Sequence, residues 1–86
     1  FMKIIYHGNV QGVGFRYFTY KKALKYNIGG SVKNLNDGTV ELIINDESKN
    51  IKPFLKDIKR GNGVMNIEKI EKKEYNCNKN DFDITY

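Results

Sequence analysis

Glycines divide this 86-residue chain into short segments, which restricts the architectures that it can form. Three glycines fall within residues 7–14, and the others stand at 29–30, 38 and 61–63. Such positions favour turns and helix ends, because glycine adopts backbone conformations that other residues avoid. We therefore expect one small domain over residues 1–86, since a doubly wound dinucleotide fold or a barrel needs far more chain.

Strand-like and helix-like patterns alternate between these glycines. They are a strand at 2–6, a loop at 7–14, a helix at 15–27, strands at 31–35 and 39–45, a helix around 51–58, a weaker strand at 67–75 and a terminal strand at 82–86. Asp37-Gly38 predicts a tight hairpin, and Ser48 or Asn50 is expected to cap the second helix. The order predicts an α+β, ferredoxin-like βαββαβ sandwich, an antiparallel sheet with two helices on one face.

The positive charge is concentrated in the first third of the chain. Residues 1–26 contain five basic and no acidic residues, whereas residues 27–86 contain ten of each, so the net charge of +5 arises in the first segment. This asymmetry favours an anionic partner or substrate there. The alternative is a solvated basic helix face with no partner.

The predicted compartment is the cytoplasm. No apolar run approaches the roughly 20 residues of a membrane span, and no signal peptide precedes the first predicted strand. The lone Cys77 cannot form an internal disulfide and suits a reducing environment. We assign Cys77 no role and interpret Phe1, which precedes Met2, as an addition ahead of the natural start.

The sequence lacks the catalytic side-chain patterns of many enzyme classes. His7 and Cys77 are single and far apart, no serine has a nucleophile-elbow context, and no cluster has metal-ligand spacing, so no metal site is expected. His7 is interpreted as structural or exposed. Three glutamates interleaved with lysines predict a solvated face; they are Glu68, Glu71 and Glu74.

The glycine-rich loop before the first helix is the strongest chemical signal. It matches neither the Walker A motif nor the dinucleotide fingerprint. A strand, a glycine loop and a helix start can nevertheless direct backbone N–H groups at an anion. Arg16 stands at this junction in a chain with thirteen lysines and only two arginines, which favours a planar, bidentate contact with phosphate or carboxylate. An ordinary surface arginine is the alternative.

A second candidate site residue lies near the end of the strand predicted at 31–35. Asn34 shares strand parity with Val32, so it is expected to point toward the same face near the edge of the core. A half-buried amide there could hold a water molecule, although a turn-related asparagine is the alternative.

The sequence resembles the acylphosphatase family over essentially its full length. Residues 8–16 (GNVQGVGFR) are similar to the G-x-V-Q-G-V-x-F-R loop of that family, and residues 30–40 (GSVKNLNDGTV) are similar to its G-x-V-x-N…G-T-V hairpin. Thr85 stands where many members carry a basic residue, which weakens the case for a C-terminal ion pair but not for the site.

The resemblance implies hydrolysis of small acyl phosphates to a carboxylate and inorganic phosphate, with no cofactor and no metal. Arg16 would bind the phosphate group, Asn34 would orient the attacking water, and Thr39 would support Arg16 or Asn34. The implied phosphate-binding residues are Gln11, Gly12, Val13, Gly14, Phe15 and Arg16.

Three alternatives remain open on the sequence. A small basic ferredoxin-like domain also describes an RNA recognition motif, but the strand at 39–45 lacks the aromatic residues on which bases stack. The chain could be a module such as the similar N-terminal domain of hydrogenase-maturation carbamoyltransferases, although its end at Tyr86 without a linker favours a free-standing enzyme. It could also bind phosphate without turnover. We expect a monomer with no nucleic-acid or membrane partner.

Overall fold

The computed structural model describes residues 1–76 and 81–85 of the chain. Its elements, in order, are β1 (Met2–Asn9), α1 (Phe15–Tyr26), β2 (Gly30–Asn34), β3 (Val40–Ile44), α2 (Ile51–Arg60), β4 (Asn66–Glu74) and β5 (Phe82–Thr85). The prediction for Cys77 and the end of the terminal strand predicted at 82–86 lie outside the described residues. The remaining elements confirm the predicted order, with boundaries that move by one to three residues.

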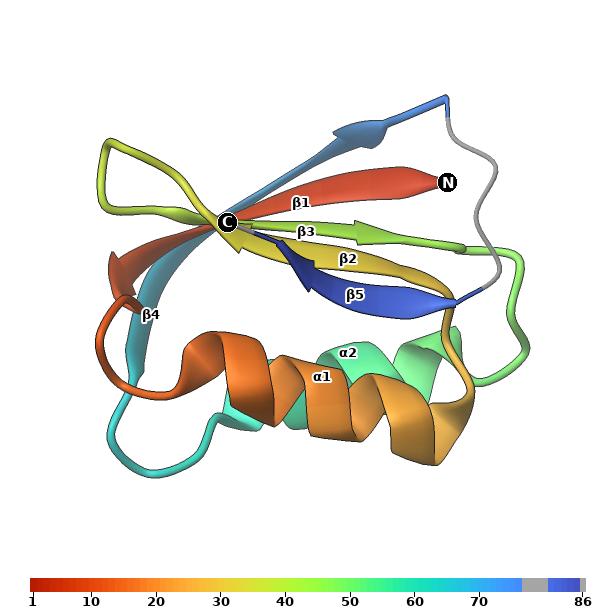
Figure 1. Ribbon diagram of the computed structural model, residues 1–86, viewed down its shortest axis with the longest axis horizontal. Coiled ribbons are helices and arrows are strands. Elements are labelled where there is room, and N and C mark those ends of the chain that lie inside the picture. Colours follow the sequence, from red (N-terminus) through yellow and green to blue (C-terminus); the bar gives the residue numbers. More distant parts are fainter. Residues whose placement is uncertain (77–80, 86) are drawn as a thin grey trace.

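Five strands form one sheet in the order β4-β1-β3-β2-β5. Both helices cover the same face of this sheet (Figure 1). The core lies between the two layers and includes Ile4 and Tyr6 of β1, Leu42 of β3, and Phe54 and Ile58 of α2. The predicted ferredoxin-like α+β sandwich is therefore confirmed.

The sheet is mixed, so the prediction of an antiparallel sheet is wrong for its last strand. β1 pairs antiparallel with β3 and β4, and β2 pairs antiparallel with β3, but β5 runs parallel to β2. The chain leaves β4 at one edge and returns at the other edge, beside β2. Because β2 already runs antiparallel to β4, a strand that reverses direction after β4 must run parallel to β2.

The loop predicted at 7–14 begins later than expected, because β1 continues to Asn9. The pairing of β1 with β4 shifts register between His7 and Gly8, and Gly8 lies opposite Ile67. A Cβ atom on Gly8 would lie 2.1 Å from the carbonyl oxygen of Asn66. The missing side chain of Gly8 therefore lets the two strands approach, so this glycine belongs to the strand and not to the loop.

The second helix begins without the predicted side-chain cap. Asn50 occupies the N-cap position, but its side chain makes no capping hydrogen bond. Its Nδ2 atom donates instead to the carbonyl of Tyr26, at 3.0 Å, and so ties the start of α2 to the end of α1. The interhelical contact replaces the local cap that the sequence pattern suggests.

Thr19 lies in the core with a hydroxyl that has no hydrogen-bond partner among the described residues. A buried, unpaired polar group costs about 1–3 kcal/mol of stability. We expect Thr19→Val, which keeps the shape of the side chain, to raise the free energy of unfolding by about 1 kcal/mol, measured by urea denaturation. The matched control is Thr39→Val, because the buried Thr39 hydroxyl donates to Asp37 and its removal is expected to destabilise. A loss of stability in Thr19→Val would contradict the prediction.

Candidate active site

The connection between β1 and α1 presents a series of backbone donors. Gly12 and Gly14 both adopt positive φ angles, 73° and 79°, and Gly14 occupies the N-cap position of α1. The first backbone hydrogen bond of the helix runs from Phe18 N–H to the Gly14 carbonyl, at 2.9 Å. Within residues 1–76 and 81–85, the N–H groups of residues 11–15 donate to no acceptor. Free N–H groups at a helix start, where the helix carries partial positive charge, can bind an anion.

A pocket of about 280 Å³ opens beside these donors. It brings together Arg16, from the first turn of α1, and Asn34, from the end of β2, which are 18 positions apart in the sequence. Its lining residues are Val10, Gly12, Gly14, Phe15, Arg16, Tyr17, Asn34 and Ile84. Of the predicted phosphate-binding residues, Gln11 and Val13 are part of the loop but do not line this pocket.

Arg16 reaches from α1 toward the last strand. Its Nη1 atom lies 3.5 Å from the carbonyl oxygen of Thr85, a long hydrogen bond to β5. The contact uses the backbone of Thr85, so it does not depend on the side chain at that position. The Thr85 hydroxyl itself donates to the carbonyl of Val32 on β2, at 3.4 Å. This contact directs one guanidinium nitrogen toward β5, which borders the pocket through Ile84.

Asn34 has the half-buried position that strand parity with Val32 predicts. Its Oδ1 atom is buried and accepts no hydrogen bond from residues 1–76 and 81–85. An unpaired buried carbonyl is costly in a folded protein, and it is a ready acceptor for a water or ligand donor in the pocket.

Gln11 acts through its side chain, which the sequence reasoning did not anticipate. Its Nε2 atom donates to the carbonyls of Leu35 and Thr39, at 2.7 Å and 2.8 Å. These two residues flank the β2–β3 turn, which lies at the same end of the sheet as the glycine loop (Figure 1). Gln11 therefore fixes the loop that precedes Arg16 to the hairpin that carries Asn34.

Thr39 contributes to this arrangement by a different route from the one expected. Its hydroxyl and its N–H both donate to Oδ1 of Asp37, at 2.5 Å and 3.0 Å. The hydroxyl hydrogen bond is the main cause of a lowered pKa of the Asp37 carboxyl. In the described structure Thr39 forms no hydrogen bond with Arg16 or Asn34, so its contact with the site is its carbonyl, which holds Gln11.

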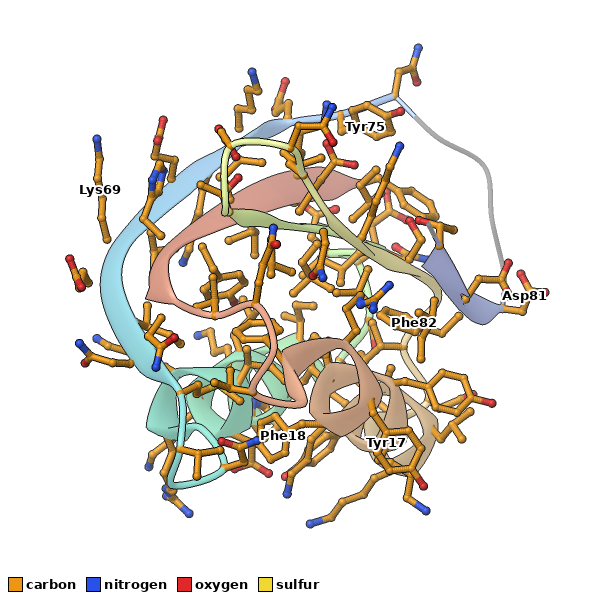
Figure 2. All side chains as sticks on the ribbon, turned by 60° about the vertical axis from the view of Figure 1, so that its left-hand side comes forward. Tyr17, Phe18, Lys69, Tyr75, Asp81 and Phe82 are labelled. Atoms are coloured by element: carbon orange, nitrogen blue, oxygen red, sulfur yellow. The ribbon has the colours of Figure 1, made fainter. Side chains whose placement is uncertain are left out.

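Sequence reasoning missed several residues at the site. Ile84 lines the pocket only because β5 lies beside β2, which no local pattern signals. Tyr17 also lines it, and its N–H group donates to no acceptor within the described chain. Figure 2 shows the Tyr17 side chain projecting from α1 away from the sheet. Asn62, in the connection from α2 to β4, donates to the carbonyl of Val13 in the loop.

The remaining candidates lie away from the pocket. His7 forms a hydrogen bond with the Glu71 carboxylate across β1 and β4, in keeping with a structural role. Glu68, Glu71 and Glu74 are exposed, as predicted for a solvated face. The described part of the chain contains no group of three His, Cys, Asp or Glu residues that could hold a metal ion.

Comparison with known proteins gives the family of this chain. A family model described as acylphosphatase matches residues 2–84. The chain belongs to the acylphosphatase family. It is 43% identical over 81 residues to an acylphosphatase of Clostridium acetobutylicum, a match covering 92% of this chain and 89% of that protein. The resemblance stated on the two motifs is thereby confirmed.

Solved structures of acylphosphatases share the fold. The crystal structure of acylphosphatase from Bacillus subtilis matches with a TM-score of 0.87 and 33% identity, over 99% of this chain and 97% of that one. The same fold also occurs within a longer protein, because T. kodakarensis HypF matches with a TM-score of 0.87 and 33% identity over only 12% of its chain. No helix in the described residues is long and apolar enough to cross a membrane.

Proposed function

We propose that this acylphosphatase family member hydrolyses the carboxyl–phosphate bond of small acyl phosphates without a metal or organic cofactor. Among the described residues, the N–H groups of the loop and the Asn34 carbonyl have no hydrogen-bond partner. The observation that carries the proposal is a single pocket that joins Arg16, the N–H groups of Gly12, Gly14 and Phe15, and the carbonyl of Asn34. The first two suit a phosphate group, and the third suits the water that attacks it.

Phosphate binding is assigned to residues 11–16. The guanidinium of Arg16 would take two phosphate oxygens in a bidentate contact, and the loop N–H groups would take the others. These donors neutralise charge on the phosphoryl group and favour its transfer, since positioning and electrostatics account for most of phosphoryl-transfer catalysis.

Asn34 is assigned to the water. Its side-chain carbonyl would accept a hydrogen bond from one O–H of the water and so turn a lone pair of the water oxygen toward phosphorus. As the oxygen–phosphorus bond forms, the bond from phosphorus to the carboxyl oxygen breaks, and the carboxylate leaves with the electron pair. The second proton of the water passes to a phosphate oxygen of the substrate, so no side chain need act as general base.

The leaving group explains why so few catalytic side chains suffice. A carboxylate is stable as an anion, so no general acid is required to protonate it. Thr39 is proposed as a supporting residue that acts through its carbonyl on Gln11. We further propose a cytoplasmic monomer whose partners are acyl phosphates and inorganic phosphate, with no nucleic-acid or membrane partner.

The proposal is tested by measuring hydrolysis of an aryl acyl phosphate, benzoyl phosphate, with and without EDTA. We expect turnover well above the spontaneous rate, unchanged by the chelator. Absence of turnover would exclude the enzyme, and binding of inorganic phosphate without turnover would indicate a phosphate-binding relative. Loss of turnover with EDTA, restored by a divalent cation, would exclude the metal-free mechanism.

A further inference from the structure

Asn62 lies outside the two sequence motifs but donates a side-chain hydrogen bond to the glycine loop. It stands in the connection between α2 and β4, between Gly61 and Gly63, which both have positive φ angles. Its Oδ1 atom accepts the N–H groups of Val64 and Met65, at 3.1 Å and 3.2 Å. These two hydrogen bonds fix the amide group on its own connection.

The other half of the same amide reaches the glycine loop. Nδ2 of Asn62 donates to the carbonyl of Val13, at 2.9 Å. A Cβ atom placed on Gly14 would lie 3.6 Å from Nδ2, so Asn62 lies directly against the peptide that joins Val13 to Gly14. Figure 1 shows the two connections, residues 10–14 and 61–65, at the same end of the molecule.

The geometry of the peptide unit links this contact to the pocket. In a planar trans peptide the C=O and N–H bonds point in opposite directions. Holding the Val13 carbonyl toward Asn62 therefore directs the Gly14 N–H away from Asn62. Gly14 lines the pocket beside Arg16, and its N–H donates to no other group in the described residues. Glycine at this position can also rotate its peptide more freely than other residues can.

We propose that Asn62 is a positioning residue that holds the Val13–Gly14 peptide in the orientation that binds phosphate. It touches neither substrate nor water, and it acts through the loop. Its benefit is preorganisation: a loop already held in the binding conformation loses less conformational freedom when the anion binds. The inference rests on the proposed assignment of the loop to phosphate.

The test compares two substitutions that separate the contacts of Asn62. Asn62→Ala removes both the hydrogen bonds to residues 64–65 and the one to Val13. Asn62→Asp keeps the acceptor for Val64 and Met65 but cannot donate to Val13, because an ionised carboxylate has no N–H. The matched control is Val64→Asp, which introduces the same charge two residues away while Asn62 is retained. Val64 is 63% exposed, so this control disturbs little packing.

The primary readout is binding of inorganic phosphate, followed by NMR through the backbone amide of Gly14, with thermal unfolding measured in parallel. We expect both Asn62 variants to weaken phosphate binding by about tenfold, the scale of one hydrogen bond, and to shift the Gly14 resonance. Val64→Asp is expected to change affinity much less. In turnover assays the Asn62 variants should raise KM more than they lower kcat.

The results test the positioning role of Asn62 separately from the proposed hydrolysis. If Asn62→Asp keeps wild-type phosphate affinity, or if Val64→Asp loses as much affinity as Asn62→Asp, then the hydrogen bond to Val13 does not position the loop. The wild-type protein could bind phosphate without hydrolysing benzoyl phosphate. If both Asn62 variants then bind phosphate more weakly than wild type, the role of Asn62 is supported while the proposed hydrolysis is excluded. A wild-type protein that binds no phosphate would overturn both.

Discussion

Replacing Arg16 with glutamine is expected to lower kcat/KM for benzoyl phosphate by on the order of 10²–10³-fold, as removal of a key charge-stabilising donor does. Glutamine keeps a polar side chain of similar reach but has neither the positive charge nor the forked guanidinium. Of the described residues that line the pocket, Arg16 alone is basic, so we expect no neighbouring side chain to replace it. The measurement is steady-state kinetics of the purified variant, with thermal unfolding to verify the fold.

Two further variants separate the charge of Arg16 from its geometry. Arg16→Lys keeps the charge but loses the bidentate contact, so its activity should lie between those of wild type and Arg16→Gln. Arg60→Gln removes the second arginine of the chain, an exposed residue at the end of α2, and should leave kcat/KM within about twofold. Near-normal turnover by Arg16→Gln would contradict the proposed mechanism.

The fold was predictable from the sequence where local patterns determine it. The apolar spacing of 51–58, the Asp37-Gly38 turn and Gly61 at the end of α2 depend on a few neighbouring residues, and these features are present in the structure. The first helix ends instead at Asn27, which adopts a left-handed backbone conformation ahead of Gly29 and Gly30. The pairing of β5 depends on the chain returning across the whole sheet, so no local signal reveals that it runs parallel to β2. The place of Gly8 within β1 was likewise not predictable, because it depends on the close approach of Asn66 from another strand.

The candidate site was likewise predictable only where local sequence patterns mark its residues. Strand parity predicts the half-buried position of Asn34, and the loop–helix junction marks Arg16, so local patterns alone make both residues candidates. The interactions that support them are long-range amide contacts: Gln11 with Leu35 and Thr39, and Asn62 with Val13. Asparagine and glutamine are common in exposed connections. Their positions in the sequence therefore do not distinguish a residue that links two distant segments from an ordinary turn residue.

The second large effect is expected at Asn34. Asn34→Ala should lower kcat by on the order of 10²-fold and change KM much less, because a misplaced reacting group has a cost of that size. The substrate phosphate would still be held by Arg16 and the loop, while the attacking water would lose the carbonyl that orients it. A change confined to KM would reassign Asn34 to substrate binding.

Asn34→Ala is expected to lower activity without lowering stability. The buried Oδ1 atom of Asn34 has no hydrogen-bond partner in the described part of the chain, so its removal eliminates an unpaired polar group. We expect the free energy of unfolding of Asn34→Ala to equal or exceed that of wild type, as occurs when a group is retained for function at the expense of the fold. Asn36→Ala, in the exposed turn two residues away, is the control for kcat and should leave it unchanged. A parallel loss of activity and stability in Asn34→Ala would instead assign Asn34 a structural role and leave the water without its proposed partner.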